Sequence, residues 1–148
     1  MRFPYKSWPY PADDPLFANK FDWSPILTVR VSYPARHSPP SRPFEAWVDS
    51  GSPHCYFQSD VGRAIGIRIE SGIESELGGI IAGPKCPVYF HDVALHIGTE
   101  IIRLRAGFCD TLAAAGILGR MGFFNNFIIN FDPSSTPPGL ELTRILRA

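Results

Sequence analysis

Residues 44–52 read Phe44-Glu45-Ala46-Trp47-Val48-Asp49-Ser50-Gly51-Ser52, an apolar run that leads into an acidic residue and then into small, turn-forming residues. A buried strand that ends this way places one carboxylate at the end of a rigid element, near backbone amides and two hydroxyls. Carboxylate chemistry needs such a setting, because amide and hydroxyl donors hold the anion at a fixed angle. On this stretch alone, an Asx-type turn that closes a strand is the simpler interpretation.

A second segment farther along the chain favours chemistry over a simple turn. Residues 115–124 read AGILGRMGFF, and residues 127–132 read FIINFD. Together with residues 44–52, they resemble the retropepsin-like aspartic proteases of clan AA, in their single-domain bacterial-type form. In that family, a strand ending in Asp-Ser/Thr-Gly-Ala/Ser precedes a short helix, a glycine-bearing flap hairpin, and then two hydrophobic residues, Gly-Arg, and a closing helix and strand. These parts occur here in that order, over about residues 24–146.

The resemblance implies a role for each residue of the Asp-Ser-Gly-Ser stretch. Asp49 would be the catalytic aspartate, and Ser50 would take the place of the hydroxyl that ties the two active-site loops together. Gly51 would let the backbone approach the carboxylate. Ser52 lies where the family varies between Ala and Ser, and its hydroxyl would be able to donate a hydrogen bond to the carboxylate.

The family's flap is matched in order and composition by a glycine- and isoleucine-rich segment. The residues implied are Gly78, Gly79, Ile80, Ile81 and Gly83. The glycines would supply bending freedom, and the isoleucines would make apolar contact with a substrate. The resemblance therefore assigns this segment to substrate binding.

The family's second motif is matched by Ile117, Leu118, Gly119 and Arg120. Retroviral members often carry an acidic residue shortly after Asp-Thr-Gly, and that residue pairs with the arginine. The comparable residues here, Ser52-Pro53-His54, include no acid. We therefore expect Arg120 to bind another partner, either a backbone carbonyl or a carboxylate elsewhere.

The chain contains one Asp-Ser/Thr-Gly sequence, whereas the chemistry implied by the resemblance needs two aspartates. Two carboxyl groups about 3 Å apart share one proton, so one takes a proton from water while the other donates to the peptide carbonyl oxygen. Asp110-Thr111-Leu112 lacks the glycine. The expected protein is therefore an aspartic endopeptidase, a homodimer with Asp49 from each subunit, which cleaves peptides or proteins between apolar residues.

Composition limits the class of protein. The chain has 148 residues, 45% of them hydrophobic, and 14 basic residues balance 14 acidic ones. This length favours one domain with a hydrophobic core of its own. A chain without net positive charge has no electrostatic attraction for nucleic acid or an anionic membrane, so neither is expected as a partner. Cys55, Cys86 and Cys109 form no CxxC pair, and the chain has no apolar run of membrane-spanning length. We expect free thiols, a cytoplasmic location and no cofactor.

The apolar pattern is mostly of period two, which is typical of strands. Strands are expected at residues 26–31, 44–48, 74–81, 87–97, 101–108, 127–131 and 140–145, with a strand start at 67–69. Short helices are expected at 59–66 and near 120–126. The pattern predicts a mainly β, mainly antiparallel barrel or sandwich. The resemblance narrows this to a small closed β-barrel of the acid-protease type, with one or two short helices and a flap hairpin.

The start of the chain differs in composition from the rest. Residues 1–22 are rich in proline and aromatic residues, and we interpret them as an N-terminal arm before a protease domain at residues 23–148. The pattern suits an extended segment laid over a surface better than a free tail. A disordered leader is the alternative.

Other functions stay open on the residues alone. A dimer that keeps the fold but has lost efficient proteolysis would be a peptide- or protein-binding module. His54 and Cys55 invite comparison with a Cys-His nucleophile, although neighbours in a strand point apart. His91, Asp92 and His96 are conceivable metal ligands, but strand residues five apart face opposite sides, so no metal site is expected.

Overall fold

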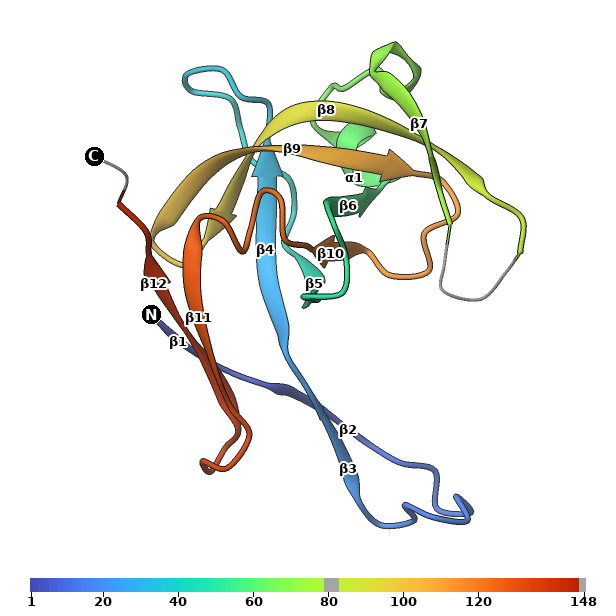
Figure 1. The fold of residues 1–148 in the computed structure, drawn as a ribbon, viewed down its shortest axis with the longest axis vertical. Helices are drawn as coiled ribbons and strands as arrows, with labels where there is room; N and C mark the ends of the chain where they lie inside the picture. Colours follow the sequence, from blue (N-terminus) through green and yellow to red (C-terminus); the bar gives the residue numbers. More distant parts are fainter. Residues whose placement is uncertain (79–82, 147–148) are drawn as a thin grey trace.

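Six strands close on themselves at the centre of the fold (Figure 1). They are β4 (Ile26–Ser32), β5 (Phe44–Val48), β6 (Cys55–Gln58), β8 (Cys86–Ile97), β9 (Glu100–Cys109) and β10 (Gly116–Leu118). The computed structural model describes residues 1–78 and 83–146. The strand order is β4-β5-β10-β6-β9-β8, and β8 pairs again with β4, which closes the ring. The expected mainly β, closed barrel is confirmed.

The remaining elements lie around this barrel. They are β1 (Arg2–Pro4), β2 (Lys6–Pro9), β3 (Phe21–Ser24), α1 (Ser59–Ala64), the 3-10 helix η1 (Ile69–Ser71), β7 (Ile73–Leu77), β11 (Phe127–Asp132) and β12 (Gly139–Arg144). β7 pairs antiparallel with β8, which gives the hairpin expected for a flap. Within the described residues, no helix is both long enough and apolar enough to cross a membrane.

Side chains that alternate between the two faces of the strands fill the interior of the barrel. In β4, Leu27, Val29 and Val31 are buried, whereas the residues between them face solvent. This is the period-two pattern of a strand with one buried face. Helix α1 lies close to β9 because Gly62 has no side chain: a Cβ there would come within 2.8 Å of the Phe108 ring. The core therefore sets the distance between the helix and the barrel.

One of two parallel strand pairs brings the two sequence motifs together. Most strand pairs are antiparallel, as expected, but β5 runs parallel to β10, and β6 runs parallel to β9. In the first pair, Val48 lies beside Leu118. Asp49 and Gly119 follow directly, so the two motifs leave neighbouring strands at the same end.

The structure differs from the sequence-based prediction at several places, among them residues 116–118, which form β10 although no strand was expected there. Residues 55–58 form β6, which was not expected because a short run that is buried almost throughout shows no alternation. The strand start expected at residues 67–69 is wrong, since η1 begins at Ile69. Residues 122–126 form hydrogen-bonded turns and not the expected short helix. Gly122 has a φ of 110° and its N–H donates to the Asn125 side chain, which favours a turn over a helix.

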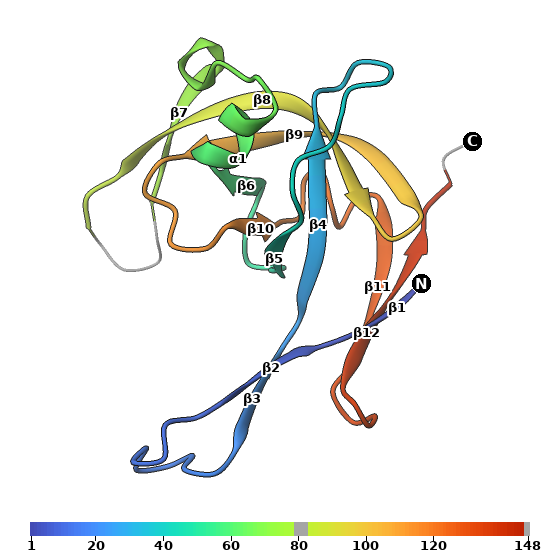
Figure 2. The same cartoon turned by 180° about the vertical axis from the view of Figure 1, so that it is seen from behind.

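The first 24 residues form three short strands with turns between the second and third, and not a free tail. β1 pairs with β12, and the Met1 and Leu142 backbones exchange hydrogen bonds of 2.8 and 2.7 Å. Phe3 packs against the barrel core. β2 and β3 then form a hairpin, which extends away from the barrel in both views (Figures 1 and 2). The division of the chain at residue 22 stays a prediction.

Candidate active site

Asp49 lies in the loop that follows β5, at the end of the barrel where β10 also ends. Its backbone N–H donates to the Leu118 carbonyl at 3.0 Å, which ties the start of the loop to β10. Its Oδ1 accepts the Gly51 N–H at 2.8 Å. A Cβ at Gly51 would lie 3.1 Å from Oδ1, so glycine gives the carboxylate room at this position. The Asp49 side chain is otherwise exposed to solvent.

The serines on either side of Gly51 contribute through different atoms. The Ser52 N–H donates to the Asp49 carbonyl at 3.2 Å, and its hydroxyl donates to the His54 carbonyl at 2.8 Å. The expectation that this hydroxyl donates to the Asp49 carboxylate is therefore wrong. The Gly51 N–H donates to the carboxylate instead. Ser50 is exposed, and its role in tying two loops together stays a prediction.

Arg120 holds the loop from the side of β10. Its Nη1 donates to the carbonyls of Ser50 and Gly51, at 2.8 and 3.1 Å, and its backbone N–H donates to the Ser52 carbonyl at 2.9 Å. Of the two partners considered from sequence, the guanidinium thus binds backbone carbonyls. Gly119 is needed beside it, because a Cβ there would overlap the His54 carbonyl.

An apolar hollow of about 430 Å³ lies beside Asp49. It is lined by Pro25, Trp47, Val48, Asp49, Ala114 and Ile117. Ile117 and Trp47 are in register across the parallel β5–β10 pair, so both side chains leave the same face of the sheet. The carboxylate therefore borders a surface that can receive an apolar group. No sequence signal indicates Pro25 or Ala114 as lining residues, because only the fold brings them to β5.

The expected flap residues are described only in part. Gly78 and Gly83 lie within the connection between the end of β7 at Leu77 and the start of β8 at Cys86. Gly79, Ile80 and Ile81 lie outside the described residues. The substrate-binding role of all five stays a prediction.

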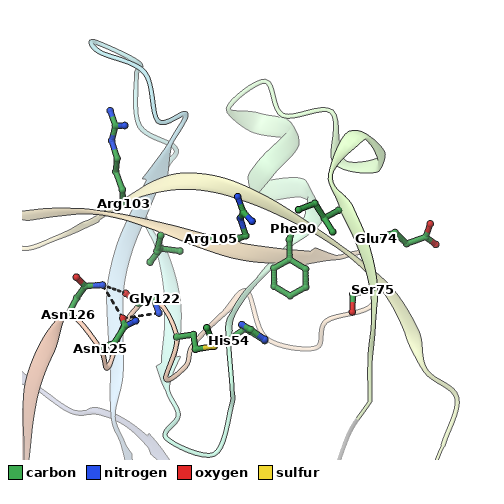
Figure 3. Close-up of a pocket in the computed structure, with 12 residues that line it drawn as sticks. His54, Glu74, Ser75, Phe90, Arg103, Arg105, Gly122, Asn125 and Asn126 are labelled. Carbon is green, nitrogen blue, oxygen red and sulfur yellow. Dashed lines mark hydrogen bonds between the residues drawn. The ribbon is translucent and has the colours of Figure 1, made fainter.

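A second hollow, of about 650 Å³, lies between β7, β9 and residues 121–126 (Figure 3). The rings of His54 and Phe90 meet edge-on there, with centroids 5.2 Å apart. Asp49 is not among its lining residues. Although this hollow is larger, we place the candidate site at Asp49, because the larger hollow lacks that carboxylate. Its polar groups, such as Asn126, come together only through folding and were not expected from sequence.

The Cys-His alternative is wrong. Cys55 is fully buried, and its thiol faces the carbonyls of Gly119 and Met121 at 3.9 and 3.7 Å. Burial raises the pKa of this thiol to about 11, so it stays protonated at neutral pH. The His54 ring instead packs against Tyr56, with centroids 6.1 Å apart. Cys55 is a core residue, and all three cysteines are free, as expected.

The conceivable metal ligands have separate partners. His91 Nε2 lies 2.7 Å from the Ile69 carbonyl, and His96 Nε2 lies 2.9 Å from the Ser32 hydroxyl. Asp92 accepts two hydrogen bonds from Arg105, at 2.8 and 3.2 Å, and these lower the pKa of its carboxyl. Over residues 1–78 and 83–146, no group of three or more His, Cys, Asp or Glu side chains is placed to hold a metal ion.

Comparisons with known proteins give likenesses to solved structures at low identity. Neither a protein-family model nor a curated protein matches the chain. The EIAV protease complexed with the inhibitor HBY-793 matches with a TM-score of 0.46 and 18% identity, over 66% of this chain and 82% of that one. The retroviral protease-like domain of Ddi1 from Leishmania major matches with a TM-score of 0.48 and 13% identity, over 70% of this chain and 80% of that one. Likeness of this degree assigns no activity.

Proposed function

We propose that the chain is an aspartic endopeptidase of the retropepsin-like kind, active as a homodimer in which each subunit supplies Asp49. The observation that carries the proposal is the Asp49 carboxylate, which is exposed at the end of the barrel while the Gly51 N–H holds its Oδ1 at 2.8 Å. The loop around it is fixed by Arg120 at two carbonyls. A carboxylate that is held in place yet open to solvent can meet its symmetry mate across a two-fold axis.

The proposed reaction uses water, two carboxyl groups and no cofactor. One Asp49, as the carboxylate, takes a proton from water, and the other, as the acid, donates a proton to the carbonyl oxygen of the peptide bond. The water oxygen attacks the carbonyl carbon directly, so no acyl-enzyme forms. When the tetrahedral intermediate breaks its C–N bond, the amine leaves with a proton and the pair returns to its starting state.

The remaining residues of the site have supporting roles in this proposal. Ser50 would link the two Asp49 loops, and Arg120 would keep each loop in place. The segment from Gly78 to Gly83 would cover the bound peptide. A cytoplasmic location, in keeping with three free cysteines, belongs to the same proposal.

A binding module is the second candidate, and the hollow beside Asp49 supports it as well. An apolar hollow of about 430 Å³ can hold a peptide side chain whether or not the neighbouring carboxylate acts on the peptide. The two candidates differ in what Asp49 does. An enzyme needs its ionisable group, whereas a binding module tolerates a neutral amide at the same position.

The test is cleavage of a diverse peptide pool at several pH values by the wild type and by Asp49→Asn, read by mass spectrometry. The proposal predicts cleavage by the wild type and none by the variant, together with a solution mass of twice the chain. Asp110→Asn is the matched control, because it makes the same change in the other Asp-Ser/Thr dipeptide. It should cleave as the wild type does.

Each part of the proposal can fail separately. Equal cleavage by the wild type and Asp49→Asn would remove Asp49 from the mechanism. An active strict monomer would refute the shared pair of aspartates. Peptide binding without cleavage at any pH would favour the binding module.

A further inference from the structure

Two of the three cysteines lie close together at one end of the β8–β9 pair. Cys86 is the first residue of β8, and Cys109 is the last residue of β9. The Thr111 hydroxyl donates to Cys86 Sγ at 2.9 Å and lies 3.5 Å from Cys109 Sγ. Cys86 also packs against a small buried cluster that consists of Tyr56, Val88 and Cys109. The two sulfur atoms therefore share one hydroxyl and one apolar cluster as neighbours.

The register of the two strands explains this proximity. β8 and β9 run antiparallel, and Tyr89 is paired with Phe108 at this end. Continuing the register places Val88 opposite Cys109, and Cys86, two residues before Val88, leaves the same face of the sheet. Such diagonal neighbours lie about 7–8 Å apart, whereas the Cα atoms of a disulfide lie about 4.4–6.8 Å apart. Because Cys86 and Cys109 are the terminal residues of their strands, a small movement of two strand ends is enough to join their sulfur atoms.

The three cysteines differ in access to solvent and in surroundings. Cys86 is partly exposed, whereas Cys109 is buried. Cys55 belongs to the main core of the barrel, where its thiol faces the carbonyls of Gly119 and Met121. A reagent in solution therefore reaches Cys86 first. Cys109 can then react with a sulfur atom attached to Cys86, and Cys55 has contact with neither.

We propose that Cys86 and Cys109 form a redox modification site, which a low-molecular-weight disulfide such as glutathione disulfide converts into an intramolecular disulfide. The reaction consists of two thiol–disulfide exchanges. In the first, the Cys86 thiol gives its proton to solvent, and its sulfur attacks one sulfur of glutathione disulfide. The S–S bond of that molecule breaks, so one glutathione leaves as a thiolate and the other stays bound to Cys86.

The second exchange closes the disulfide within the protein. The Cys109 thiol gives its proton to solvent, its sulfur attacks the Cys86 sulfur, and the second glutathione leaves as a thiolate. The two protein thiols have then lost two electrons in total, and these reduce one glutathione disulfide to two glutathione molecules, which take up the two protons. The disulfide ties the start of β8 to the end of β9. Residues 110–115, which lead from β9 to β10, are thereby fixed against β8, and they include Ala114 of the hollow beside Asp49.

The experiment exposes the folded, reduced full chain to millimolar glutathione disulfide and then blocks the remaining thiols with N-ethylmaleimide in denaturant. The intact mass should show one blocked thiol of the three and the loss of two hydrogen atoms. Trypsin cuts the chain at arginines between Cys86 and Cys109, so the two cysteines fall in different peptides, which should appear joined by a disulfide. Dithiothreitol should restore all three thiols. Hydrogen exchange of residues 110–115 should be slower in the oxidised chain than in the reduced one.

Three variants separate the two exchanges. Cys86→Ser removes the accessible thiol, so glutathione should attach to neither remaining cysteine. Cys109→Ala removes the second thiol, so the reaction should stop at the mixed disulfide, with one glutathione on Cys86. Cys55→Ala is the matched control, because it removes a buried thiol that takes part in neither exchange, and the Cys86–Cys109 disulfide should form as in the wild type. In a chain unfolded in urea the fold no longer selects the pair, so disulfides that include Cys55 should also appear.

The proposal is overturned if the folded wild type keeps three free thiols after this treatment, or if it accumulates glutathione on Cys86 without a bond to Cys109. A disulfide that includes Cys55 in the folded chain, or one between two chains, would equally overturn it. Unchanged hydrogen exchange of residues 110–115 would show that the disulfide does not fix this segment. None of these results depends on peptide cleavage, so the site and the proposed protease function can fail independently.

Discussion

Replacing Arg120 with alanine removes the side chain that holds the Asp49 loop. The guanidinium donates to the carbonyls of Ser50 and Gly51 at 2.8 and 3.1 Å. Hydrogen bonds from charged donors contribute about 1.5–3 kcal/mol each when buried. Because Arg120 is exposed and one nitrogen makes both bonds, we expect Arg120→Ala to lower the free energy of unfolding by about 1.5 kcal/mol.

The effect on activity should be larger than the effect on stability. Without the clamp, the carbonyls of residues 50 and 51 lose their fixed partner, and the Asp49 carboxylate moves with them. A displacement of about 1 Å in a catalytic group lowers the rate on the order of 100-fold. We therefore expect kcat/KM to fall by about that factor, measured on a peptide that the wild type cleaves. Urea unfolding at fixed protein concentration gives the stability, since a dimer's stability depends on concentration.

Two controls separate the clamp from general charge effects. Arg120→Lys keeps the charge but lacks the planar fork, so it should fall between the wild type and Arg120→Ala. Arg103→Ala removes another exposed arginine, on β9, and should change neither quantity appreciably. If Arg120→Ala left both the free energy of unfolding and kcat/KM within experimental error of the wild type, the clamp would have no role.

Three further predictions concern the fold. Burial raises the pKa of Cys55 from 9.0 to about 11, so the thiol loses its proton in the unfolded chain before it does so in the folded one as pH rises. The free energy of unfolding should therefore fall by up to about 3 kcal/mol between about pH 9 and pH 11, and by less in Cys55→Ala. Phe3→Ala should cost about 2 kcal/mol in urea unfolding, because Phe3 packs on the core, whereas exposed Phe21→Ala should cost little. Gly62→Ala should cost about 1–3 kcal/mol and lower the Tm, because its Cβ would lie 2.8 Å from Phe108; an unchanged Tm would show that α1 can shift freely.

Strands whose apolar residues alternate could be predicted from the sequence, whereas the short strands β6 and β10 could not. The apolar residues of β4 alternate, and the strand was predicted at residues 26–31, one residue short of its observed end at Ser32. β6 is buried almost throughout, so its run of residues has no period to detect. Parallel pairing of β5 with β10 joins residues about 70 positions apart, and local patterns carry no information on such pairs.

The residues of the candidate site could be predicted where they belong to a sequence motif. The Asp49 loop and Arg120 were identified from the sequence. The hydrogen-bond partner of Arg120 could be identified only from the structure, because every residue has a backbone carbonyl and a motif does not show which one is bound. The Ser52 hydroxyl turns to the His54 carbonyl, a choice that depends on the path of the loop. The stacking of Trp8 on Trp47, with ring centroids 6.3 Å apart, could not be predicted from sequence, since the β2–β3 hairpin brings the two rings together across the chain.

The central claim, that two Asp49 side chains form one active site, is tested most directly by mixing wild type with Asp49→Asn. After subunits have exchanged, random pairing makes the fraction of dimers with two Asp49 equal to the square of the wild-type fraction. At equal amounts, the proposal predicts about one quarter of the activity of the same total amount of wild type, because mixed dimers lack one carboxyl group. Activity of about one half, in proportion to the wild-type chains present, would show that each Asp49 works alone and would contradict the shared pair.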